Sequence, residues 1–187
     1  MENQSVVCLS CQSPRVTVLT HNMNKCQACG YFFVAVAERD RQQENFQLIT
    51  NNPVDTESLA KLKLKYPKEN HVKRELYKQY AEKVINWYGP SVAVLDVGAS
   101  GGFFLNEIEK RGASPVNLRT LEVDKTYQAL TEDYFGYAGD IENIETYKPE
   151  RQFHLISMFD VLEHVHKFWD ALATIHNTLT PDGRLLL

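Results

Sequence analysis

Apolar residues recur at helical spacing over residues 71–88, and this periodicity predicts one amphipathic helix. The apolar face is predicted to consist of Val72, Leu76, Tyr80, Val84 and Tyr88. A glycine and a proline follow at positions 89 and 90, where they are expected to end the helix. The face predicts that this helix packs against a larger core.

After residue 90, short apolar runs alternate with helical patterns. The strand-like runs are 92–97, 117–123, 134–140, 153–159 and 184–187. Helical patterns follow at 103–112, after Asp124 as N-cap, and at 168–179, where the sequence TPDG is expected to end the last helix. Such alternation predicts an α/β domain, in which helices cover both faces of a parallel sheet.

The first 70 residues have a different pattern. Residues 1–36 are expected to form a small β module, with short strands at 16–19 and 31–36, each next to a Cys-x-x-Cys turn. Residues 37–70 are polar and contain prolines, which predicts a linker with short helices. The α/β domain is then expected to span residues 71–187.

Composition fits a folded protein with no strong preference for polyanions. Of the 187 residues, 43% are hydrophobic and 24% are charged, and the net charge is −4 with a pI of about 5.9. Nucleic acid is therefore an unlikely partner, and the basic run 61–68 (KLKLKYPK) is interpreted as a solvated face, with phosphate contact as the alternative. No apolar run suits a membrane span or a signal peptide, so we expect a cytoplasmic protein without membrane contact.

All four cysteines lie in the β module, as Cys8, Cys11, Cys26 and Cys29. The spacing C-x2-C-x14-C-x2-C is typical of a site in which four thiolates surround one Zn²⁺ ion. Such a site has no open position for water, so the predicted zinc is structural. A module this small also needs a metal to fold, because its core is too small.

The stretch VLDVGASGGFFL, residues 94–105, passes from a strand through a glycine turn into a helix. This geometry brings backbone N–H groups close to a ligand. A phosphate-binding P-loop is excluded because no lysine follows the glycines. A dinucleotide fingerprint fits poorly, because Phe103 would stand where close helix packing requires glycine.

The same stretch resembles the first motif of the class I S-adenosylmethionine-dependent methyltransferases, a hydrophobic residue followed by D-x-G-x-G-x-G. Asp96, Gly98 and Gly102 match, whereas Ser100 replaces the middle glycine. The resemblance implies a Rossmann-like fold and S-adenosylmethionine as cofactor. The cofactor-binding residues that it implies are Asp96, Gly98, Ala99, Ser100, Gly102, Glu122, Asp140, Ile141 and Phe159.

Later motifs continue the resemblance in order. In LEVD the implied acceptor of the ribose hydroxyls is Glu122, with Asp124 as the alternative, although Asp124 also suits a helix cap. In GYAGDIENI, Asp140 would accept the adenine amino group and the Ile141 N–H would serve a ring nitrogen. FHLISMFDVLEHV and LTPDGRLLL resemble the motifs of the fourth and fifth strands. His154 departs from the pattern, and we interpret it as a solvated substitution.

The family resemblance implies methyl transfer to a small-molecule acceptor, such as a sugar or polysaccharide precursor, in a pocket beside Phe159. The candidates for a general base are Glu163, His164 and His166, and His164 is preferred because imidazole titrates near neutral pH. The alternative is that Glu163 and His164 cap or brace a helix start. A zinc ribbon also precedes some ribosomal RNA methyltransferases, so an RNA acceptor is the second hypothesis. A noncatalytic cofactor-binding module is the third.

The sequence ends inside the fifth predicted strand, whereas the sheet of the family has two more strands. We therefore expect an incomplete sheet that has an exposed edge. Such an edge favours self-association.

Overall fold

In a computed structural model of the chain, the described residues are 6–20, 23–34, 49, 51–68 and 72–187. The chain divides into two compact units, residues 1–48 and 49–187. Each unit has its own core. No helix in the described ranges is long and apolar enough to cross a membrane.

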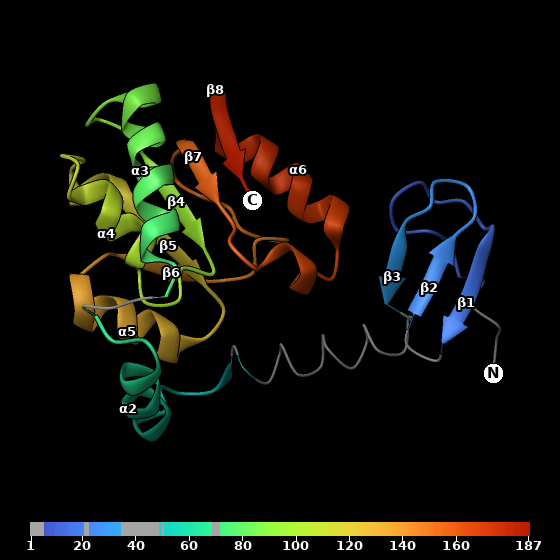
Figure 1. Cartoon of the computed structure of the whole chain (residues 1–187), viewed down its shortest axis with the longest axis horizontal. Helices are drawn as coiled ribbons and strands as arrows, with labels where there is room; N and C mark the ends of the chain where they lie inside the picture. The colour runs from blue at the N-terminus through green and yellow to red at the C-terminus, as the bar shows by residue number, and fades with distance from the viewer. Residues whose placement is uncertain (1–5, 21–22, 35–48, 50, 69–71) are drawn as a thin grey trace. The chain divides into compact units, whose positions relative to one another are not determined.

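The first unit contains an antiparallel sheet of three strands (Figure 1). They are β1 (Val16–Thr20), β2 (Met23–Cys26) and β3 (Phe32–Val34). The sequence pattern missed β2, because its residues MNKC lack an apolar alternation. Cys26 therefore ends a strand, with its Cα opposite that of Val16. Residues 35 and 36, expected to continue the last strand, lie outside the described ranges.

The second unit is built on a parallel sheet in the order β6-β5-β4-β7-β8 (Figure 1). The strands are β4 (Val94–Val97), β5 (Leu118–Glu122), β6 (Gly139–Ile141), β7 (Phe153–Ser157) and β8 (Leu179–Leu186). The central strand, β4, is buried throughout, as its continuous run of apolar residues around one aspartate requires. The predicted fold class is confirmed.

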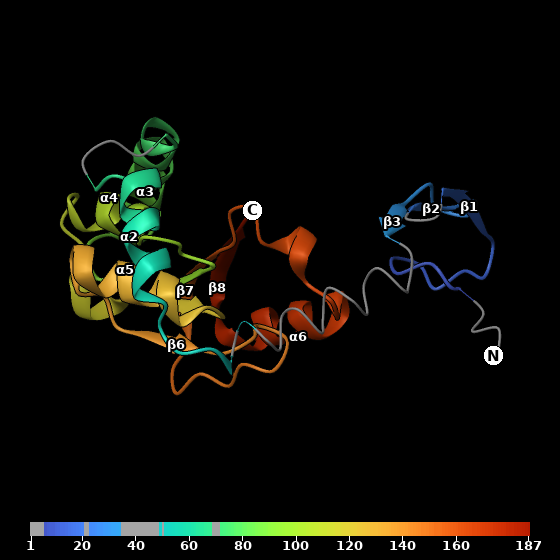
Figure 2. The ribbon, with the colours of Figure 1, turned by 90° about the horizontal axis from the view of Figure 1, so that it is seen from below.

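Helices cover both faces of this sheet (Figures 1 and 2). The α-helices are α2 (Thr56–Lys65), α3 (Arg74–Tyr88), α4 (Phe103–Glu109), α5 (Lys125–Phe135) and α6 (Phe168–Thr178). Two 3₁₀ turns occur at Pro115–Asn117 and Leu162–His164. On one face α3 and α4 pack on Val94, Leu118 and Leu155, whereas α6 packs on the other face against Leu95 and Ile156.

The buried face of α3 matches the predicted one only in part. Val72 precedes the helix and is 89% exposed, and Leu76 is 42% exposed. Val84 of the predicted face is fully buried, as expected, but the other buried residues are Tyr77 and Ala81. The helix carries apolar residues on two adjacent faces, and the face that contains the small residue Ala81 packs against α4. Periodicity alone could not choose between these two faces.

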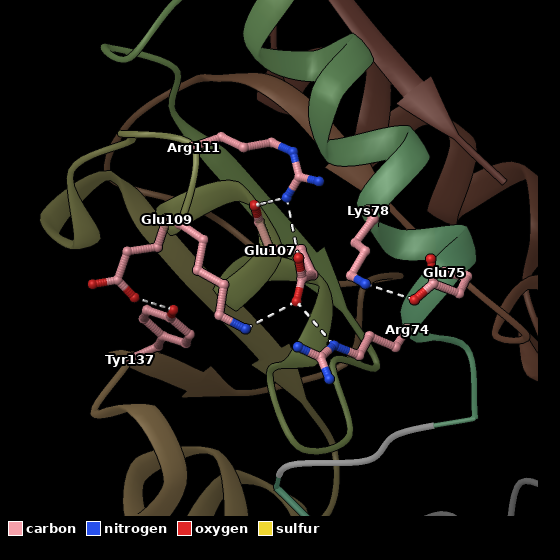
Figure 3. Close-up of polar contacts among 8 residues, drawn as sticks. Arg74, Glu75, Lys78, Glu107, Glu109, Arg111 and Tyr137 are labelled. Carbon is pink, nitrogen blue, oxygen red and sulfur yellow. Dashed lines mark hydrogen bonds and ion pairs between the residues drawn. The ribbon is translucent and has the colours of Figure 1, made fainter.

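A buried carboxylate joins α3 to α4 (Figure 3). Glu107 of α4 is 5% exposed, and its carboxylate accepts hydrogen bonds from Lys110 at 2.9 Å and Arg111 at 3.1 Å. The Arg74 Nε of α3 lies 3.8 Å from the same group. Although burial would raise the pKa of Glu107, the hydrogen bonds and charges of Lys110 and Arg111 outweigh it and lower the pKa.

The end of α6 also differs from expectation. The residues TPDG, predicted as a break after the helix, lie inside β8, because α6 already ends at Thr178. The pairing of β8 with β7 is irregular between Phe153 and Leu155, which accommodates the proline and glycine. Tyr88 at the end of α3 donates its hydroxyl to the Asp182 carbonyl at 3.0 Å and so fixes this segment.

Candidate functional site

The glycine turn directly follows β4. Gly98, Ser100 and Gly102 have φ angles of 66°, 58° and 74°, so every second residue is left-handed. Ser100 thus adopts the conformation that the motif normally gives to glycine, at a cost of about 1 kcal/mol. Thr131 of α5 donates its hydroxyl to the Ser100 carbonyl at 3.0 Å, which helps to hold this conformation.

Close packing also requires glycine at positions 98 and 102. A Cβ on Gly98 would stand 2.4 Å from Cγ2 of Val161, and one on Gly102 would stand 2.9 Å from Cγ2 of Thr131. Val161 therefore contacts the turn from the segment that follows β7. No periodicity in the sequence indicated this contact, because it depends on how two loops fold back over the sheet.

Glu122 ends β5 beside the turn. It is 5% exposed, and its Oε1 accepts a hydrogen bond from the Ser100 N–H at 2.6 Å. Burial raises the pKa of Glu122 to about 8, even though the Ser100 N–H favours the ionised form. The structure thus brings Glu122 next to the glycine turn, as the sequence predicts. Further hydrogen-bond donors at this carboxyl group would stabilise its ionised form.

Asp96 lies at the centre of the sheet, beneath the turn. It is 3% exposed, and its Oδ1 accepts the Ser157 hydroxyl of the neighbouring strand at 2.7 Å. Burial raises the pKa of Asp96 to about 7. This hydrogen bond therefore joins β4 to β7, the two strands that are followed by the glycine turn and by the segment that contains Val161.

Asp140 and Ile141 lie in β6, on the other side of β5. Ile141 pairs in register with Glu122 and is 36% exposed, so its backbone lies next to the glutamate. The Asp140 carboxylate already accepts hydrogen bonds from Arg119 at 3.2 Å and from the Tyr147 hydroxyl at 2.8 Å. The sequence analysis missed both partners, because their proximity depends on strand register.

Phe159 and His164 lie beyond the end of β7 but in different surroundings. The Phe159 ring packs against Tyr77 and Phe104, with both centroid distances 5.0 Å. Phe159 thus anchors an aromatic cluster under α3. His164 lies in the 3₁₀ turn with an exposed side chain, and its backbone N–H donates to the Val161 carbonyl at 2.9 Å.

Glu145 holds the segment that follows His164. Its Oε1 accepts the backbone N–H groups of His166 at 2.7 Å and Lys167 at 2.8 Å. Glu145 comes from the connection between β6 and β7, so these two hydrogen bonds join that connection to the segment that follows β7. No sequence signal marked Glu145, because a lone glutamate in a polar stretch carries no distinguishing pattern.

Three other residues singled out in the sequence have structural partners. Asp124 caps α5, as predicted, because its carboxylate accepts the Thr126 N–H at 2.7 Å. His154 is not simply solvated: its Nδ1 accepts the Ala93 N–H at 2.9 Å. In the basic run, Lys63 pairs with Asp133 at 2.9 Å.

The four cysteines meet in the first unit. Their sulfur atoms lie within 4.8 Å of one another, with Cys8 to Cys29 at 3.7 Å and Cys11 to Cys26 at 3.6 Å. Four sulfurs at about 2.3 Å from one zinc ion would lie about 3.8 Å apart, so the cluster fits a tetrahedral zinc site.

The two halves of the cysteine cluster are built alike. The N–H of Gln12 donates to the Cys8 carbonyl at 2.9 Å, and the N–H of Gly30 donates to the Cys26 carbonyl at 3.0 Å. Gln12 and Gly30 both have positive φ angles, 57° and 78°. Each Cys-x-x-Cys turn is therefore closed by a left-handed residue directly after its second cysteine. This repeated geometry presents two thiols from each turn toward one point.

Comparison with known proteins gives a family for the second unit. A family model described as a methyltransferase domain matches residues 39–187. The chain therefore belongs to this methyltransferase-domain family. No protein with a curated function matches the sequence.

Solved structures share the fold at low sequence identity. A SAM-bound amino pentose methyltransferase from Micromonospora echinaspora has a TM-score of 0.54 and 18% identity, over 72% of this chain and 56% of its own. DesVI from Streptomyces venezuelae has a TM-score of 0.52 and 18% identity, over 72% and 57%. The N-methyltransferase NodS from Bradyrhizobium japonicum, solved with S-adenosylhomocysteine, has a TM-score of 0.52 and 16% identity, over 77% and 70%. The chain thus spans little more than half the length of the first two.

Proposed function

We propose that this protein transfers a methyl group from S-adenosylmethionine to a small-molecule acceptor, with a sugar or polysaccharide precursor as the acceptor class. The observation that carries the proposal is the buried carboxyl group of Glu122, bonded to the Ser100 N–H at 2.6 Å. A carboxyl group at this place suits a ligand with vicinal hydroxyl donors, such as a ribose. The family match and the fold of the SAM-bound amino pentose methyltransferase support the same ligand.

The cofactor supplies an electrophilic methyl group on a sulfonium. The residues of this chain would hold the cofactor over the glycine turn, with the ribose at Glu122 and the adenine near Asp140 and Ile141. Val161, in contact with Gly98, limits the space above the turn. Fixing acceptor and cofactor in line in this way can lower the barrier by about 7–11 kcal/mol.

His164 is the proposed general base where the acceptor must lose a proton. Its side chain is exposed, and Glu145 holds the following backbone through His166 and Lys167. His164→Asn is expected to lower the turnover rate by about 10²–10⁴-fold with cofactor affinity nearly unchanged. A rate within a few-fold of the parent would remove His164 from catalysis.

We further propose that the ion held by Cys8, Cys11, Cys26 and Cys29 is structural Zn²⁺. The sulfur separations and the two matching Cys-x-x-Cys turns support this assignment. Zinc at such a site contributes about 10–16 kcal/mol of apparent binding free energy, which can fold a module whose described core is only Cys8, Cys26 and Phe33 with a few flanking residues.

The activity is tested with methyl-labelled S-adenosylmethionine. The chain is incubated with the small-molecule fraction of cells in which the protein occurs naturally and, separately, with total RNA from the same cells. The proposal expects label in the small-molecule fraction. Label only in RNA would favour the RNA hypothesis, and label in neither fraction would contradict methyl transfer to either acceptor.

A further inference from the structure

Two side chains hold the carboxylate of Asp140, one at each oxygen. Arg119 of β5 donates to Oδ1 at 3.2 Å, and the hydroxyl of Tyr147 donates to Oδ2 at 2.8 Å. Each oxygen of an ionised carboxylate has two lone pairs, so each oxygen can still accept a further hydrogen bond. The Asp140 side chain is 38% exposed, so a ligand can reach these lone pairs.

Asp140 lies at the end of the sheet where the cofactor is proposed to bind. In the pairing of β6 with β5, Asp140 lies beside Leu121, and Ile141 lies beside Glu122, the proposed partner of the ribose. These residues end two neighbouring parallel strands, and ligands of open parallel sheets bind at the carboxyl ends of the strands. The base attached to a ribose at Glu122 would then face the end of β6.

Tyr147 is the more rigid of the two partners of Asp140. It is 7% exposed and belongs to the core on the α6 face of the sheet. Burial, together with the hydrogen bond and the charge of Asp140, raises the pKa of Tyr147 above its usual range, so its hydroxyl remains a donor. The side chain of Arg119 is 33% exposed, and solvent screens its ion pair with Asp140. The orientation of the carboxylate therefore depends mainly on Tyr147.

We propose that Tyr147 is a positioning residue, which fixes the Asp140 carboxylate and so makes the site selective for a purine with an exocyclic amino group. This inference rests on the proposed binding of S-adenosylmethionine and names the residue that sets its base selectivity. A carboxylate held by two donors stays ionised and can only accept hydrogen bonds. It therefore binds the amino group of adenine and repels the carbonyl oxygen that hypoxanthine has at the same position.

Base selectivity is measured by calorimetric titration with S-adenosylhomocysteine and with S-inosylhomocysteine, in which a carbonyl oxygen replaces the amino group. The parent should bind the adenosine compound at least about tenfold more tightly, because only this compound donates a hydrogen bond to the charged group. Equal binding of both ligands would overturn the base selectivity alone. Absence of binding by either ligand would instead contradict the proposed cofactor site.

Tyr147→Phe removes the hydroxyl donor and keeps the buried ring. The ratio of the two affinities is expected to fall at least about threefold, because the freed carboxylate can rotate away from the amino group. A general loss of stability affects the binding of both ligands alike and therefore leaves this ratio unchanged. The ratio thus separates positioning of Asp140 from a merely structural role of Tyr147.

Tyr137→Phe is the matched control. Tyr137 is also buried, and its hydroxyl donates to another carboxylate, that of Glu109. This variant should lose a comparable hydrogen bond and keep the affinity ratio of the parent. An unchanged ratio in Tyr147→Phe, or an equal fall in Tyr137→Phe, would overturn the role assigned to Tyr147.

Asp140→Asn tests the carboxylate itself. The amide of asparagine can turn and donate its NH₂ group to the carbonyl oxygen of hypoxanthine, so this variant should bind the two ligands within about threefold of each other. A ratio that stays at the value of the parent would overturn the assignment of base selectivity to Asp140 and Tyr147.

Discussion

Oε1 of Glu122 accepts a hydrogen bond from the N–H of Ser100 at 2.6 Å, which joins the end of β5 to the glycine turn. Burial raises the pKa of this carboxyl group to about 8. A ligand that donates two hydroxyl hydrogen bonds to Glu122 favours the ionised form, so its binding should release a proton near neutral pH. Affinity for S-adenosylhomocysteine is expected to rise as the pH increases toward about 8 and then level off.

This proton release is measured by calorimetry at pH 7 in two buffers with different ionisation enthalpies. The apparent binding enthalpy of the parent should differ between the buffers by the released proton. Glu122→Gln, which cannot ionise, should lose the contribution of this group. Binding by the parent without any buffer dependence would contradict the role assigned to Glu122.

The same pKa makes a prediction for the chain without ligand. A carboxyl group whose pKa is raised on folding contributes stability that is fully present below its unfolded pKa and is lost as the pH rises through the folded value. Glu122 should therefore reduce the free energy of unfolding between about pH 4.5 and pH 8. Thermal unfolding of the parent and of Glu122→Gln across this range should show a smaller loss of stability in the variant. An equal loss in both proteins would contradict the raised pKa.

Gly98→Ala should disrupt the glycine turn through collision as well as backbone strain. Its Cβ would stand 2.4 Å from Cγ2 of Val161, and overpacking of this kind costs about 1–3 kcal/mol. Gly112→Ala is the control, because Gly112 also has a positive φ angle, 98°, but an added Cβ would meet no atom within 4 Å. Chemical denaturation should show the larger loss of stability for Gly98→Ala. Equal losses would contradict a steric constraint of Val161 on the side chain at position 98.

The contribution of the buried Glu107 carboxylate to stability is tested by substitution (Figure 3). Glu107→Gln removes a buried charge that accepts hydrogen bonds from Lys110 and Arg111. The free energy of unfolding should fall by about 1–2 kcal/mol. The loss is limited to this range because water can solvate the Lys110 and Arg111 cations in the variant. Glu75→Gln is the control: Glu75 pairs with Lys78 at 2.6 Å and its side chain is 78% exposed. A loss no larger than that of the control would contradict a stabilising role for the buried Glu107 carboxylate.

The architecture of the second unit was predictable because its central strands β4, β5 and β7 are mostly buried and have largely apolar sequences. The cysteine spacing likewise indicated a single cluster, because thiolate geometry limits the possible arrangements. The buried face of α3 was predictable only in part, since Leu76 and Tyr77 offer two adjacent faces and only packing against α4 chooses between them. Contacts such as Val161 on Gly98 depend on loop paths that no local pattern encodes.

Removal of one thiolate should unfold the first unit and spare the second. Cys26 is completely buried, and its sulfur also accepts the Ala28 N–H at 3.3 Å. Cys26→Ser is expected to reduce bound zinc to well below one ion per chain and to collapse the amide dispersion of residues 6–34 in NMR spectra. Signals from β4 to β8 should remain in place. Full zinc occupancy in the variant, or less than one zinc per chain in the metal-replete parent, would contradict the assignment.

The most direct test of the account is calorimetric titration of the 187-residue chain with S-adenosylhomocysteine, for the parent, Glu122→Ala and Asp124→Asn. The parent should bind one ligand, and Glu122→Ala should weaken binding by about 1.5–3 kcal/mol, because charge-assisted hydrogen bonds are lost. Asp124→Asn keeps a helix-capping side chain and should bind as the parent does. Absence of binding by the parent, or an affinity that Glu122→Ala leaves unchanged, would contradict a cofactor site at the glycine turn and Glu122.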